Sequence, residues 1–304
     1  MACGRMYHFN VFAYGVEEIL REVSKKGTES DIRLYNRKEE DGVMTFIEPI
    51  KYPDKVSSLT DSIYPTDLFI INGENLDKYF AETVIALDLF GKTRGIIVAS
   101  EDKQSTIRKL LKDTNIQPEF FSGRPMEIID RIKAFKIERN EQDTLVVIDH
   151  YFKVKSVGTV ILGFVLSGKI RKHQDLYLSG INREVQVRSI QVNDVDFDEA
   201  EAGTRVGVAL KNVEVEELSR GMFLAEKPFE YTNQVKDSVV FHKSLKGRDT
   251  MSDPYISDLM NFVKCNPEGD AYTTRFKLPL LKDSFVMADQ NGFPRVVGYS
   301  KVKR

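Results

Sequence analysis

The sequence predicts a protein of mixed class, an α/β domain followed by two all-β domains that each form a barrel. Strand-like and helix-like patterns alternate over about the first 135 residues, which favours a mainly parallel sheet with helices on both faces. After Thr144 the pattern changes to short strands separated by Gly and Asp, and a second β-rich segment begins near residue 232. We therefore expect domains at residues 1–140, 141–229 and 230–304.

The N-terminal segment contains apolar runs typical of buried strands and stripes typical of amphipathic helices. The expected strands are 7–14, 31–36, 43–48, 67–71, 94–100 and 118–122, and the turn RKEEDG joins the second and third as a hairpin. The expected helices are 53–63, 74–91, 105–111 and 125–139. In the second helix the apolar residues recur at spacings of three and four, at Leu76, Tyr79, Phe80, Val84 and Leu87.

The rest of the chain contains short strands and shows no helical periodicity. The first group is LVVIDHYFKV, GTVILGFVLSG, DLYLSG, REVQVRSIQV, RVGVALK and MFLAE, and the second is DSVVFHK, AYTTRFKLPL, DSFVMAD and PRVVGYSKV. Because many short strands with frequent turns are typical of barrels, we expect two closed or nearly closed ones. The aromatic residues Tyr151, Phe152 and Phe164 stand at strand spacing and are expected in the core.

Composition excludes several classes of function. A formal net charge of −2 over 304 residues excludes global basicity, so a nucleic-acid partner would have to meet a local basic patch. Cys3 and Cys265 lie far apart, and the four histidines do not cluster, so we expect reduced thiols and no metal site. No apolar run approaches the ~20 residues of a membrane span, which predicts a cytoplasmic protein without a membrane partner.

One short stretch, ALDLFGKT from Ala86 to Thr93, matches the relaxed pattern of a phosphate-binding loop. Such a loop needs a strand before it and a helix after it, because backbone N–H groups and the helix N-terminus hold the anion. Here the order is helix, glycine, strand. We therefore interpret Gly91 as the C-terminal cap of a helix and not as part of a phosphate site.

A true phosphate loop would follow the first strand, at Gly15. The sequence there reads GVEEILREVSKKG, without the second glycine or the Lys-Ser or Lys-Thr pair. Glu17 and Glu18 stand where the anion would lie. Their carboxylates would repel a triphosphate, while they suit the first turn of an ordinary helix.

The segment from Ile148 to Glu226 resembles the second domain of translational GTPases of the elongation factor Tu and selenocysteine-factor family. The resemblance depends on short motifs in the family's order, namely Val157-Gly158-Thr159-Val160, Gly168-Lys169-Ile170, Arg188-Ser189-Ile190-Gln191, Ala202-Gly203-Thr204-Arg205-Val206-Gly207 and Ser219-Arg220-Gly221. PRVVGYSKV is similar to the end of the family's third-domain barrel. KKGTESDIRLYN and ETVIALDLFGKTRGIIVAS resemble the archaeal selenocysteine-factor-like paralogue proposed to serve pyrrolysyl-tRNA.

The resemblance implies a GTPase-like N-terminal domain, but the sequence departs from the family's motifs there. The family's Asp-x-x-Gly should follow VMTFIE, where this chain has Glu48-Pro49-Ile50-Lys51. Its Asn-Lys-x-Asp should follow GIIVA, where the chain has Ser100-Glu101-Asp102-Lys103. Phosphoryl transfer depends on positioning and charge neutralisation, so losing these motifs together with the phosphate loop predicts a degenerate domain with no GTP or magnesium cofactor and no GTP hydrolysis.

The resemblance also implies a site on the second domain for the aminoacylated 3′ end of tRNA. Carried over, the candidate contacts are Arg188, Asp198, Glu199, Glu201 and Arg205. Basic clusters could meet phosphates, and these are Lys169, Arg171, Lys172 and His173, then Lys243, Lys246 and Arg248, then Lys301, Lys303 and Arg304. The alternative is that these charged turns only face solvent.

We therefore expect an elongation factor-like protein that binds tRNA or the ribosome through its barrels without a GTP switch. Two alternatives stay open from the sequence. The chain could be a scaffold that binds a translation-factor partner and never contacts tRNA, or a GTPase that still binds GTP and magnesium at a noncanonical site.

Overall fold

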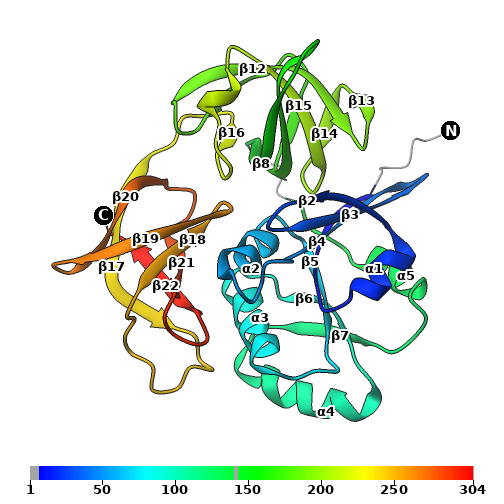
Figure 1. The fold of residues 1–304 in the computed structure, drawn as a ribbon, viewed down its shortest axis with the longest axis vertical. Helices are drawn as coiled ribbons and strands as arrows, with labels where there is room; N and C mark the ends of the chain where they lie inside the picture. The colour runs from blue at the N-terminus through cyan, green and yellow to red at the C-terminus, as the bar shows by residue number, and fades with distance from the viewer. Residues whose placement is uncertain (1–6, 140–142, 304) are drawn as a thin grey trace. The chain divides into compact units, whose positions relative to one another are not determined.

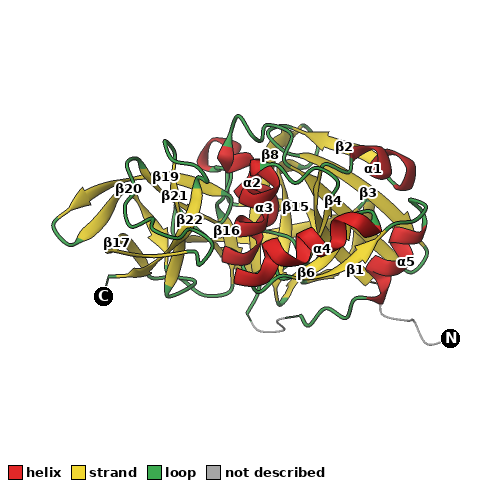
Figure 2. Ribbon diagram, turned by 90° about the horizontal axis from the view of Figure 1, so that it is seen from below, coloured by secondary structure: helices red, strands yellow, loops and turns green. Residues whose placement is uncertain are grey.

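The computed structural model describes residues 7–139 and 143–303, and their contacts group into two compact units. The first unit comprises residues 1–10, 36–45 and 136–229, and the second comprises 11–35, 46–135 and 230–304. Figure 1, coloured along the sequence, shows the labelled helices in the N-terminal part of the chain, and Figure 2 shows the helices and strands in separate colours. Cys3 and Arg304, both named above, lie outside the described residues.

A seven-stranded sheet forms the frame of the N-terminal part, in the order β2-β3-β4-β1-β5-β6-β7. The strands are β1 (Tyr7–Tyr14), β2 (Lys25–Glu29), β3 (Arg33–Glu39), β4 (Gly42–Glu48), β5 (Leu68–Asn72), β6 (Arg94–Val98) and β7 (Gln117–Phe121). Strands β1, β5, β6 and β7 pair in parallel, as the alternation of strand and helix patterns predicts. The edge strand β2 was not expected from its polar sequence KKGTE.

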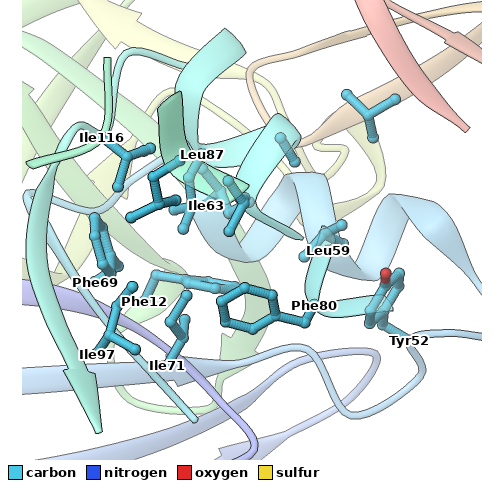
Figure 3. Packing of buried hydrophobic residues seen from close by; sticks show 14 of the residues in the cluster. Phe12, Tyr52, Leu59, Ile63, Phe69, Ile71, Phe80, Leu87, Ile97 and Ile116 are labelled. Atoms are coloured by element: carbon cyan, nitrogen blue, oxygen red, sulfur yellow. The ribbon is translucent and has the colours of Figure 1, made fainter. Parts of the chain in front are cut away.

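Helices connect the strands of this sheet. They are α1 (Glu17–Val23), α2 (Val56–Ile63), α3 (Lys78–Leu89), α4 (Glu101–Leu110) and α5 (Glu127–Ala134), with a 3-10 turn at Leu111–Asp113. Helix α5 is shorter than the expected 125–139 because Phe135 leaves the helix in an extended conformation. Phe12, Phe69, Ile71 and Ile97 from the strands pack against Leu59, Ile63, Phe80 and Leu87 from α2 and α3, as Figure 3 shows.

The end of α3 confirms the interpretation of ALDLFGKT. Gly91 has φ +70°, and its N–H donates to the Asp88 carbonyl at 2.9 Å, while the Lys92 N–H donates to the Leu87 carbonyl at 2.8 Å. These are the bonds of a glycine-capped helix end. The stretch therefore closes α3 and leads into β6.

The first barrel lies in the first unit and comprises β8 to β16. Its strands are β8 (Leu145–Val154), β9 (Gly158–Ser167), β10 (Lys169–Arg171), β11 (Asp175–Leu178), β12 (Arg183–Val192), β13 (Val195–Phe197), β14 (Glu199–Glu201), β15 (Arg205–Lys211) and β16 (Phe223–Ala225), with a 3-10 turn at Val215–Glu217. The main sheet has the order β11-β16-β8-β9-β15-β12-β13. Because β11 also pairs with β12, the sheet closes on itself around buried Val, Ile and Leu side chains.

The second barrel lies in the second unit and is closed, in the order β17-β20-β19-β18-β21-β22. Its strands are β17 (Tyr231–Phe241), β18 (Pro254–Asp258), β19 (Asn261–Glu268), β20 (Ala271–Pro279), β21 (Ser284–Asp289) and β22 (Val296–Val302). Val286 and Val296 of this barrel belong to the same apolar cluster as α2 and α3. The predicted combination of an α/β domain with two barrels is confirmed.

Candidate functional site

A cavity of about 730 Å³ opens at the carboxyl ends of the parallel strands in the second unit. Tyr14 ends β1, Asn72 ends β5 and Val98 ends β6, and all three line the cavity. Ligands of open α/β sheets bind at this edge, because the loops that follow the strands surround it. The position is therefore where a nucleotide would be expected in a GTPase-like domain.

The turn after β1 is braced by β5. Gly15 has φ +69°, and the Asn72 side-chain amide donates to the Gly15 carbonyl at 3.0 Å. A Cβ at Gly15 would lie 3.0 Å from the Asn72 Cβ, so glycine suits both the backbone conformation and the space. Asn72 Oδ1 also accepts from the Glu74 N–H at 2.8 Å, so both polar ends of the amide have partners.

The charges that line this cavity are mostly negative. Its lining includes Glu17, Glu18 and Glu48, and one cationic side chain, Arg33. Arg33 Nη1 lies 2.7 Å from Glu17 and 3.3 Å from Glu48, and its Nε lies 2.7 Å from Glu29. The charge of Arg33 is thus already neutralised by carboxylates.

Burial opposes the ionisation of one of these carboxyls. It raises the pKa of Glu48, although the nearby Arg33 acts in the opposite direction. A bound triphosphate would bring further negative charge beside Glu17 and Glu18 at the start of α1. The residues present do not fit a nucleotide triphosphate with its metal ion.

The segment expected to replace the guanine clamp lies where β6 ends and α4 begins. The Ser100 N–H and hydroxyl both donate to the Glu74 carboxylate, the hydroxyl at 3.0 Å. Glu101 and Asp102 form the acidic first turn of α4. These carboxylates stabilise the helix start, which is the ordinary role of acidic residues there.

In the first barrel, the short ribbon of β10 and β14 brings two of the expected site residues together with a basic cluster. Lys169 pairs in register with Glu201, and Arg171 pairs with Glu199. Lys169 Nζ lies 3.0 Å from Glu201 and 3.5 Å from Glu199, and Arg171 Nε lies 3.4 Å from Glu199. Cations and carboxylates therefore alternate over one small surface.

Asp198 extends this surface at the loop before β14. Its side chain is 95% exposed and lies 3.9 Å from Lys172 Nζ. Such an exposed, weakly held carboxylate is available to a hydroxyl or amine of a partner. Together these side chains form one surface of mixed charge. It consists of the carboxylates of Asp198, Glu199 and Glu201 and the cations of Lys169, Arg171 and Lys172, and we call it the ribbon surface.

Arg205 belongs to a buried ion cluster and not to the ribbon surface. Its guanidinium lies 3.8 Å from Asp149, while Arg220 Nε and His150 Nδ1 lie 3.7 and 2.8 Å from the same carboxylate. The Asp149 side chain is fully buried, and burial lowers the pKa of Arg205 while Asp149 acts to raise it. We call these four residues the Asp149 cluster.

Arg188 lies at a β-bulge in β12, apart from both groups. Its Nη1 donates to the Val157 carbonyl at 2.6 Å and so braces the turn between β8 and β9.

Near this turn Tyr151 and Phe152 are 37% and 41% exposed, so the prediction that they lie in the core is wrong. Phe164 is fully buried, as expected. The aromatic pair leaves the barrel core because β8 extends as a long hairpin with β9.

The other basic residues have different surroundings. Arg248 donates to Asp289 at 2.7 Å and to the Pro294 carbonyl at 2.6 Å, which makes it part of the second barrel's structure. Lys303 pairs with Asp270.

Among residues 7–139 and 143–303, no helix is long and apolar enough to cross a bilayer.

Sequence reasoning did not identify Asp149 and Arg220 as members of an ion cluster. The signal was available for Asp149, because it is a charged residue within the apolar run LVVIDHY, and a buried charge needs partners. Arg220 gave no comparable signal. The strands β8 and β15 bring Asp149 and Arg205 together, and a turn far along the chain supplies Arg220.

Comparison with known proteins agrees with this architecture. Residues 158–225 match the family model of elongation factor Tu domain 2. An uncharacterised protein of Methanocaldococcus jannaschii is 32% identical over 298 residues, which cover 94% of this chain and 96% of the relative. The selenocysteine-specific elongation factor of the same organism is 48% identical over 80 residues, or 26% of this chain and 17% of that protein.

Solved structures extend the likeness to the whole fold. Translation elongation factor SelB from Methanococcus maripaludis, in complex with the GTP analogue GppNHp, matches with a TM-score of 0.81 at 19% identity. That match covers 99% of this chain and 80% of the other. A bacterial selenocysteine-specific elongation factor matches with a TM-score of 0.77 at 17% identity, covering 97% and 58% of the two chains.

Proposed function

Because this chain belongs to the translational GTPase family of elongation factor Tu and the selenocysteine-specific elongation factors, we propose that it binds tRNA through its first barrel without hydrolysing GTP. The observation that carries this proposal is the ribbon surface, where Lys169 lies 3.0 Å from Glu201 and Arg171 lies beside Glu199. The 3′ end of a tRNA offers phosphates together with ribose hydroxyls. A surface with adjacent cations and carboxylates can bind both at once.

The Asp149 cluster supports this proposal because it fixes the positions of two arginine side chains. Two guanidinium groups and an imidazole surround one buried carboxylate, so Arg205 and Arg220 are held in defined positions. Their side chains are partly exposed, at 15% and 24%. We assign them the role of donors to the aminoacyl end of the tRNA, together with Arg188 on β12.

In this proposal GTP is not hydrolysed because of the charges that line the cavity at the carboxyl ends of the parallel strands, which we call the strand-edge cavity. Glu17, Glu18 and Glu48 would oppose the phosphates, and Arg33 is engaged by carboxylates. Calorimetric titration with GTP and GDP in the presence of magnesium tests this part of the proposal, the loss of nucleotide binding. Micromolar, magnesium-dependent binding would overturn it.

The experiment that tests RNA binding is filter binding with aminoacylated and deacylated tRNA at two salt concentrations. We expect retention that weakens as salt rises, because cations of the ribbon surface would displace counterions from phosphates. We also expect tighter binding of the aminoacylated form. Equal and negligible retention of both forms would refute the proposal.

A second candidate function is binding of a protein partner from the translation apparatus. Tyr151 and Phe152 favour it, because two exposed aromatic residues at the end of a hairpin are typical of protein contacts. Replacing both residues by Ser separates the two functions. Binding of tRNA should survive that change, whereas a protein contact at the hairpin should not.

A further inference from the structure

We propose that a bulge in β20 of the second barrel binds single-stranded nucleic acid, with one base stacked on the Phe276 ring and phosphates at Arg275 and Lys277. We call these three residues the β20 bulge, and Figure 1 labels the strand. The β20 bulge belongs to the second unit, whereas the ribbon surface belongs to the first. The proposal therefore goes beyond tRNA binding by the ribbon surface, and the two can fail separately.

The pairing of β20 with its neighbours opens at this point. Next to β17 the register jumps, so that Asn233 alone stands opposite residues 274–277 of β20. Next to β19 the pairing ends at Thr274. The three residues of the β20 bulge thus lie outside the ladders with both neighbouring strands. Bulges of this kind redirect side chains and are common next to binding sites.

The bulge turns Phe276 away from the barrel core. Tyr272 and Leu278, which stand an even number of positions away, pack with the core cluster, and a regular strand would direct Phe276 to the same side. Phe276 is instead 64% exposed, the largest fraction for a large apolar residue in the described part of the chain. The buried Thr274 hydroxyl donates to the Phe276 carbonyl at 2.6 Å and so fixes the turned backbone. An open aromatic face is therefore in place before a ligand arrives.

The charges beside this ring are positive. The Arg275 guanidinium lies 5.6 Å from the centre of the Phe276 ring, and Lys277 on its other side is also exposed. Neither cation forms an ion pair within residues that the structure describes, whereas Lys264 of the same barrel lies 2.8 Å from Asp253. Two such cations beside an exposed ring suit an anionic ligand that carries planar groups.

Nucleic acid fits this set of side chains better than a protein partner does. Lysine is depleted in protein interfaces, whereas an aromatic ring with adjacent cations is the usual combination for binding single strands. Residues 231–303 also contain more cationic than acidic side chains, although the whole chain has a net charge of −2, so this barrel favours a polyanion. Only an unpaired base offers a free face for stacking, so a duplex does not use the ring.

Fluorescence anisotropy of the full chain at low salt tests the proposal, with a labelled oligouridylate of about ten nucleotides as the probe. An oligothymidylate and an RNA duplex of the same length are the comparison ligands. We expect the duplex to bind about tenfold more weakly than the single strands, because it loses the stacked base. RNA and DNA offer the same stacking, and the more tightly bound strand identifies the natural ligand. Equal affinity for duplex and single strands, or binding of neither, would overturn the proposal and leave the exposed ring to a protein contact.

Variants of Phe276 separate stacking from a merely apolar contact. Phe276→Tyr keeps an aromatic face and should leave the affinity within about twofold, whereas Phe276→Leu keeps only the apolar bulk and should weaken binding about tenfold. Val240→Ala, which shortens a 47% exposed apolar side chain of the same barrel, should leave binding unchanged. Circular dichroism checks that each variant is folded. Equal affinities of Phe276→Leu and Phe276→Tyr would refute stacking.

Variants of the two cations test the phosphate contacts. Arg275→Ala and Lys277→Ala should each lower the slope of log affinity against log salt by about 0.7, the value for one phosphate of a single strand. Lys264→Ala is the matched control, because Asp253 already neutralises this exposed lysine. Slopes that fall equally in all three variants would show general attraction to a basic barrel and would refute the site.

One further variant separates the β20 bulge from the ribbon surface. Arg171→Ala removes a cation of the ribbon surface and should leave oligonucleotide binding unchanged, since Arg171 belongs to the first unit. Equal losses of oligonucleotide affinity in Arg171→Ala and Phe276→Leu would overturn the separate site at β20. Failure of the filter-binding test with tRNA, together with intact oligonucleotide binding, would refute only the function of the ribbon surface.

Discussion

Arg295 Nη2 lies 2.7 Å from Glu82 Oε2 and joins the loop before β22 of the second barrel to helix α3. The Arg295 backbone N–H and Nε also donate to Glu82, and its Nη1 donates to the Pro53 carbonyl at 2.7 Å. The Tyr52 hydroxyl donates to the same carboxylate at 2.8 Å. One fully buried carboxylate therefore accepts donors from the barrel and from the segment before α2.

Glu82→Ala should destabilise the second unit by about 3–5 kcal/mol, because it leaves the buried Arg295 charge without its partner. Urea unfolding followed by tyrosine fluorescence measures this loss. The matched control is Glu119→Ala, which removes an exposed partner 3.9 Å from Arg131 and should cost less than about 0.5 kcal/mol. Similar costs for the two variants would contradict a structural role for the Glu82 pair.

Asp258 should make the stability of the second unit depend on pH. Burial raises the pKa of Asp258 to about 6 from an ordinary value of 3.8, although Lys282 and the Tyr64 hydroxyl act to lower it. The folded protein thus holds this proton more tightly than the unfolded chain. The resulting stabilisation is complete below pH 4 and is lost as pH rises through about 6, by up to about 3 kcal/mol.

Asp258→Asn removes this titration while it keeps an oxygen that accepts from Tyr64. We therefore expect the variant to gain stability relative to the natural chain between pH 4.5 and pH 7, as measured by urea unfolding at both values. Asp249→Asn changes an exposed carboxyl of the same barrel and serves as the control. A difference that stays constant with pH in Asp258→Asn would show that Asp258 is ionised throughout.

Asp149→Asn should loosen the first barrel. The change leaves Arg205 and Arg220 without the carboxylate that lies within 3.8 Å of both, at an expected cost of about 3–5 kcal/mol. Hydrogen exchange of β8 and β15 amides reports this locally, because these strands hold Asp149 and Arg205. Asp143→Asn, an exposed partner of Lys227, should leave the exchange unchanged. Unchanged protection in Asp149→Asn would mean that the cluster does not hold the barrel together.

Arg171→Ala tests the ribbon surface directly. The Arg171 side chain is 55% exposed, so its loss should leave the fold intact. If it contacts a phosphate, tRNA affinity should fall about threefold or more, and the salt dependence should lose about one unit of slope. Arg131→Ala is the control, because this exposed arginine lies on α5 of the second unit. Parallel salt curves for Arg171→Ala and the natural chain would remove Arg171 from the interface.

Local patterns allowed most of the fold to be predicted. The end of α3 at Gly91 could be identified because a glycine after an amphipathic stripe and before an apolar strand has one ordinary meaning. The alternation of strands and helices predicted the parallel arrangement of β1, β5, β6 and β7. Strand β2 was missed because KKGTE is polar on both faces and gives no period-2 signal.

The candidate site could be predicted only in part. Glu199 and Glu201 are neighbours on one strand, so their shared surface follows from alternation along β14. The exposure of Tyr151 and Phe152 did not follow, because a strand's sequence does not show where it extends beyond the barrel. Nor could the sequence show that Arg205 points to Asp149 and not to the ribbon surface.

By itself the sequence determined the order of the domains, the helix that ends at Gly91 and the acidic turn at Glu17 and Glu18, since each depends on residues close together along the chain. Only the tertiary structure decided which charges neutralise one another. Arg33 meets Glu17 and Glu48, and Asp149 meets Arg205 and Arg220, across separations that only the folded sheet and barrel close. An electrostatic field depends on distances in space, and spacing along a chain does not give these.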